Sequence, residues 1–201
     1  MKRLNQNNPH NYFHVSGYCP YPAWPSESVS DVWSDFNDTL ADFEDDHVKT
    51  HAFVLLPDHY EWICSMPEDA DVLGTLSWFQ ECVGFVTLHS GAKSEFRDSA
   101  MEPQSFFIGP PNYTQLNSLD TYRQAYCYTY GSPTENKLVA KPQHYPYSTM
   151  PYVLGLMEDN LGFTCWDNMG LISHPQAVFD EIEHYWMMYH KHIMGSDEPT
   201  N

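Results

Sequence analysis

A histidine and a glutamate, His59 and Glu61, stand two residues apart at the start of an apolar segment that follows a Pro-Asp turn. Side chains alternate along an extended chain, so His59 and Glu61 share one face while Tyr60 and Trp62 share the other. An imidazole and a carboxylate at this spacing form half of a divalent-metal site. The alternative is an exposed polar face above a buried aromatic one, and the two residues alone leave both interpretations open.

The composition is that of an acidic globular protein. The chain has 201 residues, of which 42% are hydrophobic and 15% aromatic, enough for one domain with a substantial core rather than a disordered chain. Its formal net charge of -18 arises from 9 Lys+Arg against 27 Asp+Glu. Charged residues make up only 18% of the chain, below the usual value of roughly 25%, so basic residues are scarce. This shortage argues against a halophilic surface and against broad electrostatic affinity for nucleic acid.

Several functional classes lack their sequence signatures. The five cysteines are scattered without a Cys-x-x-Cys pair, which favours reduced thiols over a disulfide framework or a zinc site. The chain contains no Gly-rich phosphate loop, Gly-x-Ser-x-Gly elbow or Cys/His dyad. It has neither a secretory signal nor an apolar run of about 18 residues. We therefore expect a soluble, cytoplasmic protein without a membrane partner.

Hydrophobic periodicity predicts alternating strands and amphipathic helices. In the helix at 69–89 we expect Val72, Leu73, Leu76, Phe79, Val83 and Val86 to face the core. Another helix begins after the N-cap Ser118, has Asp120 in its first turn and ends before Pro133. This order of elements predicts an α+β protein in which helices pack on an antiparallel sheet. Strands are expected at 12–17, 49–55, 59–65, 105–109 and 112–116, and helices at 26–45, 69–89, 119–131 and 175–192.

The third expected helix has an internal tyrosine pattern. Tyr122, Tyr126 and Tyr130 recur every four residues and form one stripe, which is typical of core packing, whereas Tyr128 lies off it. The domain boundaries that we expect are a flexible N-terminus at 1–10, the main domain at 11–150, an extension with a helix at 151–194 and a tail at 195–201. Histidines near the end of the chain are expected to face solvent rather than bind metal: His184, His190 and His192.

Two segments resemble a known family. Val54-Leu-Leu-Pro-Asp-His-Tyr-Glu-Trp62 resembles the strand pair of the REP-associated branch of the single-tyrosine HUH transposases, which contains two histidines separated by one residue. The segment from Tyr128 to Ser148 (YTYGSPTENKLVAKPQHYPYS) is similar, without a gap, to the block that begins at the nucleophilic tyrosine of that family. The resemblance covers roughly residues 10–150. It implies a ferredoxin-like sheet with helices packed on it, plus a C-terminal helix.

The resemblance also implies a reaction and the residues that perform it. Such transposases cut and rejoin single-stranded or hairpin DNA through a 5′-phosphotyrosine, with Mg²⁺ or Mn²⁺ on the scissile phosphate. Carried over by position, Tyr128 is the nucleophile, and His59, Glu61 and Ser132 are the metal ligands. Tyr128 and Ser132 are four residues apart, so a helix places them on one face.

This chain departs from the family pattern at several positions. Glu61 replaces the second histidine, Ser132 replaces an asparagine ligand, Asp58 replaces another asparagine, and most DNA-gripping basic residues are missing. Two hypotheses follow. The first is an active nicking and strand-transfer enzyme. The second is a domesticated, non-catalytic module that binds a protein partner or a nucleic acid. A monomer and a homodimer are both compatible with the sequence.

Overall fold

The computed structural model describes residues 10–19, 29–45, 47–89, 106–158, 161–165 and 180–185. Every expected strand except one, and every expected helix that falls in these ranges, is present. Of the expected flexible start at 1–10, residues 1–9 lie outside the described residues, and His10 is instead the first residue of a strand. The expected tail at 195–201 also lies outside the described residues. In chain order the elements are β1 (His10–Tyr18), α1 (Val29–Asp45), β2 (Lys49–Leu55), β3 (His59–Pro67), α2 (Val72–His89), β4 (Asn112–Gln115), α3 (Leu119–Glu135), a 3₁₀ turn (Pro142–His144) and α4 (Met150–Val153).

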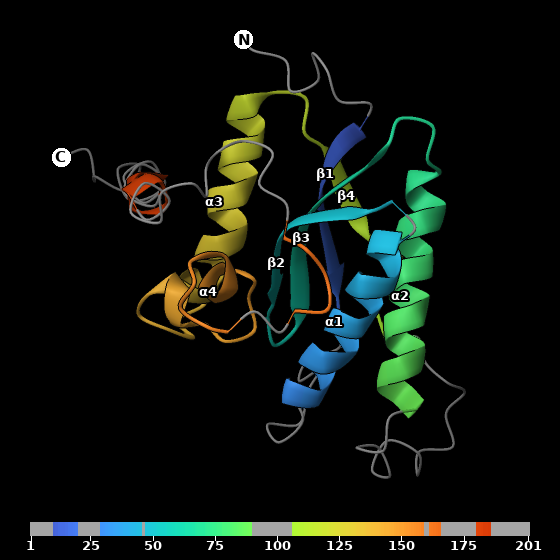
Figure 1. Cartoon of the computed structure of the whole chain (residues 1–201), viewed down its shortest axis with the longest axis horizontal. Helices are drawn as coiled ribbons and strands as arrows, with labels where there is room; N and C mark the ends of the chain where they lie inside the picture. The colour runs from blue at the N-terminus through green and yellow to red at the C-terminus, as the bar shows by residue number, and fades with distance from the viewer. Residues whose placement is uncertain are drawn as a thin grey trace, which may run out of the picture.

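The four strands form one antiparallel sheet in the order β2-β3-β1-β4 (Figure 1). The helices α1 and α2 connect strands that are not neighbours, which gives the βαββαβ arrangement of a ferredoxin-like fold. The predicted α+β class with a ferredoxin-like sheet is therefore confirmed. The register between the central strands places Ser16 opposite Glu61 and His14 opposite Ile63.

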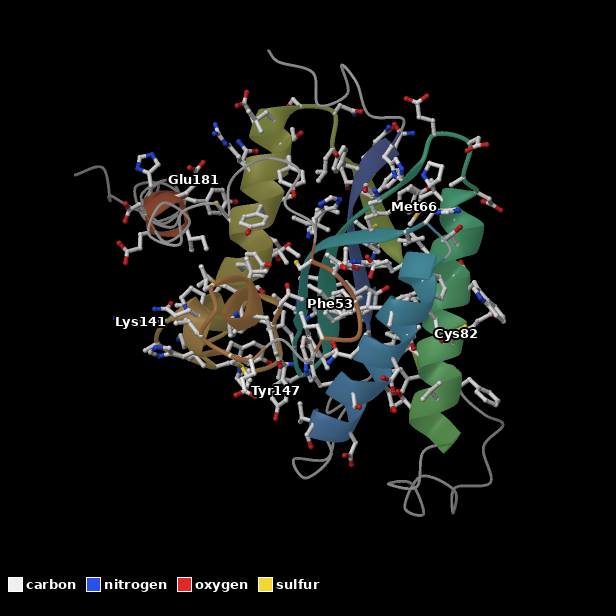
Figure 2. The ribbon with its side chains drawn as sticks, viewed as in Figure 1. Phe53, Met66, Cys82, Lys141, Tyr147 and Glu181 are labelled. Carbon is white, nitrogen blue, oxygen red and sulfur yellow. The ribbon has the colours of Figure 1, made fainter. Side chains whose placement is uncertain are left out.

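One face of the sheet is covered by α1 and α2 (Figure 1). Aromatic side chains fill the space between these layers, including Phe53, which Figure 2 labels. The core-facing residues expected in α2 are only partly confirmed, because Leu73 and Val86 are substantially exposed while the other described members of the set are not. Since α2 is apolar on nearly all sides, hydrophobic spacing alone does not define its buried face.

The opposite face of the sheet is covered by α3 (Figure 1). The predicted tyrosine stripe is confirmed, since Tyr122, Tyr126 and Tyr130 are all buried in the core between α3 and the sheet. Segments that follow α3 pack along the edge strand β2, where Ser148 pairs with Val54 and Cys165 pairs with Thr50. The strands β2 and β3 are thus covered on both faces, whereas the edge strand β4 is exposed.

The helix α3 begins as predicted but ends later. Ser118 is the N-cap, and it forms a reciprocal capping box with Thr121. The expected end before Pro133 is wrong, because α3 continues to Glu135. Pro133 has no N–H to donate to the carbonyl of Thr129, and the Ser132 hydroxyl donates to that carbonyl at 2.7 Å instead. A side-chain donor therefore compensates for the backbone hydrogen bond that proline removes.

Two further expectations concern short or terminal segments. The strand expected at 105–109 is wrong where the structure describes it, since residues 106–110 form bends. The helix expected at 175–192 is helical over 180–185, and its other residues lie outside the described ranges. His184 is exposed as expected, whereas His190 and His192 are not described. Within the described residues, no helix combines the length and hydrophobicity needed to cross a membrane.

Candidate functional site

The strand β3 begins at His59 and directs alternate side chains to opposite faces of the sheet. Tyr60 and Trp62 belong to the core beneath α1 and α2, as predicted. His59 and Glu61 lie on the side of α3 and are buried, with only 8% and 2% of their surfaces exposed. The interpretation of this pair as an exposed polar face is therefore wrong. The reason is tertiary: α3 covers the face that the strand pattern alone left open.

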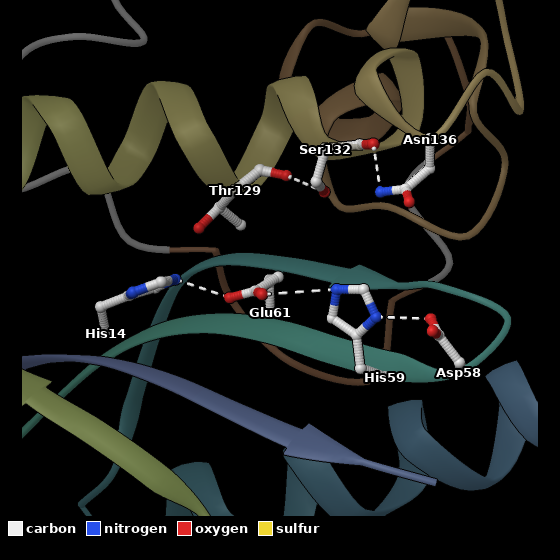
Figure 3. A network of polar contacts seen from close by, with 7 residues as sticks. All are labelled: His14, Asp58, His59, Glu61, Thr129, Ser132 and Asn136. Carbon is white, nitrogen blue, oxygen red and sulfur yellow. Dashed lines mark hydrogen bonds and ion pairs between the residues drawn. The ribbon is translucent and has the colours of Figure 1, made fainter. Parts of the chain in front are cut away.

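Four side chains form a continuous polar network on this face (Figure 3). Asp58 Oδ1 lies 2.6 Å from His59 Nδ1, and His59 Nε2 lies 3.4 Å from Glu61 Oε1. The second oxygen of the same carboxylate, Glu61 Oε2, lies 2.7 Å from Nε2 of His14 on β1. This last contact has the distance of an ion pair but not the angles of a well-formed hydrogen bond. Glu61 is thus held between two imidazoles.

Burial and partners act in opposite directions on these groups. Burial lowers the pKa of His59, but hydrogen bonds and charge interactions with Glu61 and Asp58 outweigh it and raise the pKa above its usual value. Burial raises the pKa of Glu61, but contacts with His14 and His59 outweigh it and lower the pKa. The arrangement therefore favours an imidazolium at His59 between two carboxylates.

The helix α3 contributes two hydroxyl groups above this network (Figure 3). Ser132 and Thr129 are fully buried. The Ser132 hydroxyl donates its proton within the helix, and Asn136 Nδ2 donates to the Ser132 carbonyl at 2.9 Å. Thr129 Oγ1 is buried and has no hydrogen-bond partner among the described residues. Of the two hydroxyls between α3 and β3, that of Ser132 is hydrogen-bonded and that of Thr129 has no hydrogen-bond partner among the described residues.

Tyr128 lies at the side of the network. It is half-buried and stands off the buried tyrosine stripe. Its ring packs edge to face on His14, with ring centroids 5.8 Å apart and an interplanar angle of 84°. Because His14 also contacts Glu61, the two sequence-predicted segments meet through a third strand. The structure thus connects Tyr128 with Glu61 and His59, and it places Ser132 on the same helix.

Sequence reasoning missed His14. A single histidine in a strand that also contains Tyr12 and Phe13 gives no signal of its own. Only the register between β1 and β3, in which Ser16 is opposite Glu61, places the His14 side chain diagonally beside the carboxylate. Thr129 was not predicted either. Its hydroxyl matches no sequence motif, and the functional role on this helix was assigned to the neighbouring Tyr128.

A divalent cation would bind His59 Nε2 only in place of the proton on that nitrogen, with Glu61 as its second protein ligand. His59 Nε2 and Glu61 Oε1 face one another at 3.4 Å, close enough for both to contact one ion, and Asp58 orients the imidazole from its other nitrogen. Ser132 retains lone pairs after donating its proton to Thr129. Across the described residues, no group of three His, Cys, Asp or Glu side chains forms a metal cage. His59 Nε2 and Glu61 Oε1 thus supply two donors, of types that Mg²⁺ or Mn²⁺ accepts, and not a complete cage.

Comparison with known proteins gives a fold-level relationship. No family model matches the chain, and no curated protein matches it. Among solved structures, it is similar to a REP-associated tyrosine transposase bound to a REP hairpin, with a TM-score of 0.58 and 14% sequence identity. The match covers 84% of this chain and 94% of the transposase chain. The protein has a transposase-like fold.

Proposed function

We propose that this protein binds single-stranded or hairpin DNA and cleaves it through Tyr128, as part of a transposition-related reaction. The observation that carries the proposal is the chain of contacts from Tyr128 through His14 to Glu61 and His59 on a transposase-like fold. The solved structure with this fold is itself bound to a DNA hairpin. His14 thus connects a half-buried tyrosine, a nucleophile of covalent catalysis, with a buried carboxylate–imidazole pair.

The reaction exchanges one phosphodiester bond for another. The Tyr128 oxygen attacks the scissile phosphorus after its proton passes to solvent, and a P–O bond forms to the tyrosine. The bond to the 3′-oxygen breaks, and this oxygen takes up a proton, which leaves a 5′-phosphotyrosine and a free 3′-hydroxyl. Attack by a 3′-hydroxyl on the phosphotyrosine reverses the step and rejoins the strand. No oxidant or external energy source is needed.

The residues of the network have separate roles in this proposal. His59, Glu61 and the Ser132 hydroxyl would hold Mg²⁺ or Mn²⁺, which supplies Lewis-acid stabilisation of the phosphate when bound. Asp58 fixes the orientation of the His59 ring through Nδ1. Contacts with His14 and His59 keep the Glu61 carboxylate ionised although it is buried beneath α3, away from bulk water.

The experiment that tests the proposal is covalent trapping. Purified protein is incubated with a panel of 5′- or 3′-labelled single-stranded and hairpin oligonucleotides plus Mn²⁺, and the products are separated on a denaturing gel. We expect a protein–DNA adduct that carries the DNA segment 3′ of the cut, formed by the wild type and by Tyr126→Phe but abolished in Tyr128→Phe. Tyr126→Phe is the matched control because it removes a tyrosine hydroxyl from the same helix. An adduct that persists in Tyr128→Phe would refute the assignment.

A second candidate function, a non-catalytic binding module, is favoured by a specific observation. Both nitrogens of His59 already face carboxylates, and the Ser132 hydroxyl compensates for Pro133, so each group has a structural role without a metal. Basic residues are also scarce: the described ones are Lys49, Arg123, Lys137 and Lys141, and Arg123 lies 3.5 Å from Glu181.

The two candidates differ in their dependence on salt. A protein whose basic side chains contact several phosphates loses affinity for DNA steeply as the salt concentration increases, because each contact releases counterions. The binding-module candidate predicts no adduct with any oligonucleotide of the panel and a shallow salt dependence. A steep slope in a fluorescence-anisotropy titration with a hairpin oligonucleotide would count against it.

A further inference from the structure

We propose that His14 on β1 is the positioning residue of this site: it holds one oxygen of Glu61 so that the other faces His59, and it orients the Tyr128 ring. The inference rests on the proposed function. His14 lies outside both sequence motifs, and we assign to it the role of connecting them. His14 contacts the carboxylate on one side and the tyrosine on the other.

The first step of the argument concerns Glu61. Its carboxylate is buried, and its two oxygens have different partners: Oε2 lies 2.7 Å from His14 Nε2, and Oε1 lies 3.4 Å from His59 Nε2. A buried carboxylate needs polar partners at both oxygens, since an unpaired buried charge is costly. Without His14, Oε2 loses its contact, and the carboxylate gains by rotating toward His59. That rotation would place both oxygens against one imidazole and close the edge where a cation fits.

The second step concerns Tyr128. Its side chain is half-buried, whereas the tyrosines of the stripe are buried. The edge-to-face contact with His14, at 5.8 Å and 84°, is the geometry that aromatic rings prefer. His14 therefore limits the directions in which the Tyr128 hydroxyl points. A nucleophile held near its attack geometry reacts faster than a freely rotating one.

The third step is that one ring makes both contacts. The His14 side chain is 23% exposed, so it lies at the boundary between the buried network and solvent. A displacement of Glu61 is thus transmitted to Tyr128 through a single rigid imidazole. His14 therefore links the two sequence motifs, on β3 and α3, from the neighbouring strand β1.

The variants His14→Ala and His14→Gln separate the two roles. Glutamine retains an N–H donor for Glu61 but lacks an aromatic ring. We expect His14→Ala to lower both Mn²⁺ affinity and the rate of adduct formation by about 10-fold or more, the usual effect of removing an orienting partner of a metal ligand. We expect His14→Gln to restore most of the Mn²⁺ affinity while the adduct rate remains low. Mn²⁺ affinity is measured by the loss of the free-ion electron paramagnetic resonance signal.

The matched control is His51→Gln. His51 is a fully buried histidine on the same side of the sheet as His14. Its Nε2 lies 2.9 Å from Ser65 Oγ, and its ring packs on Tyr12 and Tyr122, outside the network. A loss of stability caused merely by altering a buried imidazole would appear in this variant as a lower melting temperature. We expect its Mn²⁺ affinity and adduct rate to equal those of the wild type at a temperature where both proteins are folded.

A nuclear magnetic resonance measurement tests the positioning role independently of metal binding and of DNA cleavage. We expect the imidazole resonances of His14 to shift in Glu61→Gln and also in Tyr128→Leu, because the ring contacts both partners. Absence of any adduct with wild-type protein would refute the proposed function alone, while shifted His14 resonances would still support the positioning role. Resonances that move in neither variant, or a His14→Ala protein with wild-type Mn²⁺ affinity and adduct rate, would overturn the inference.

Discussion

The two faces of the sheet bury side chains of different chemistry at the same depth. Beneath α1 and α2 the core is aromatic and aliphatic, with Phe36, Trp62 and Phe79 fully buried and in ring contact with their neighbours. Beneath α3 the buried groups include His59 and Glu61 together with hydroxyls. Burial of apolar surface contributes about 25 cal/mol per Å², whereas a buried polar group stabilises only when it is paired. The face beneath α1 and α2 therefore stabilises the fold through apolar burial, whereas the face beneath α3 combines an apolar core with a paired polar network.

Side chains alternate along β3, so residues that are adjacent in sequence belong to different faces of the sheet. Glu61 and Trp62 are consecutive, but they point to opposite sides of the sheet. A substitution of Trp62 alters the core beneath α1 and α2, whereas a substitution of Glu61 alters the polar network beneath α3. Substitutions on the two faces should consequently separate loss of stability from loss of chemistry.

The largest expected effect on stability is on the face beneath α1 and α2. Trp62→Ala should lower the free energy of unfolding by about 3–5 kcal/mol, because it removes a fully buried ring and leaves a cavity. Urea denaturation followed by circular dichroism measures the change. A loss below about 1 kcal/mol, the size expected for an ordinary surface substitution, would contradict the conclusion that this face stabilises the fold.

A smaller loss of stability should follow from a change at the polar face. Glu61→Ala is expected to lower the free energy of unfolding by about 1–3 kcal/mol, since His14 and His59 lose a charged partner while Asp58 still contacts His59. The same variant should lose Mn²⁺ binding. Glu68→Ala, at an exposed position of similar charge, serves as the control and should change neither property.

The polar face should also make stability depend on pH. The pKa of His59 is raised above its ordinary 6.5, so its contribution is complete below that pH and is lost as pH rises through the raised value. The pKa of Glu61 is lowered below its ordinary 4.5, so its contribution is complete above that pH and is lost as pH falls through the lowered value. The network is therefore most stabilising between these two values.

Urea denaturation at about pH 5.5 and about pH 8 measures this dependence, because the first lies inside the window and the second above it. We expect the wild type to be less stable at the higher pH. His59→Gln should reduce that difference, since glutamine does not titrate. An equal difference in the variant would show that other groups cause the pH dependence.

The smallest expected effect has the opposite sign. Thr129→Val replaces a fully buried hydroxyl that has no hydrogen-bond partner among the described residues by a methyl group of the same shape. We expect the free energy of unfolding to increase by up to about 1 kcal/mol, because an unsatisfied polar group is removed. A loss of more than about 1 kcal/mol, measured by urea denaturation, would show that the hydroxyl has a stabilising partner.

Much of the fold follows from local patterns. Strand alternation predicts that His59 and Tyr60 face opposite sides, and the four-residue repeat predicts the buried tyrosine stripe of α3; both predictions are confirmed. The end of α3 was not predictable from Pro133 alone, because its continuation depends on the side-chain hydrogen bond from Ser132 to Thr129. The exposure of Leu73 was not predictable either, since apolar residues lie on nearly all sides of α2.

The sequence by itself determined the α+β class, the strand that presents His59 and Glu61 on one side, and the position of Tyr128 off the tyrosine stripe. These follow from periods of 2 and 3.6 residues, which are properties of single elements. The tertiary structure alone decided that the polar side of β3 is buried and that Glu61 is held by His14. The reason is physical: burial depends on where α3 docks, and partners depend on the register between strands that are distant in sequence.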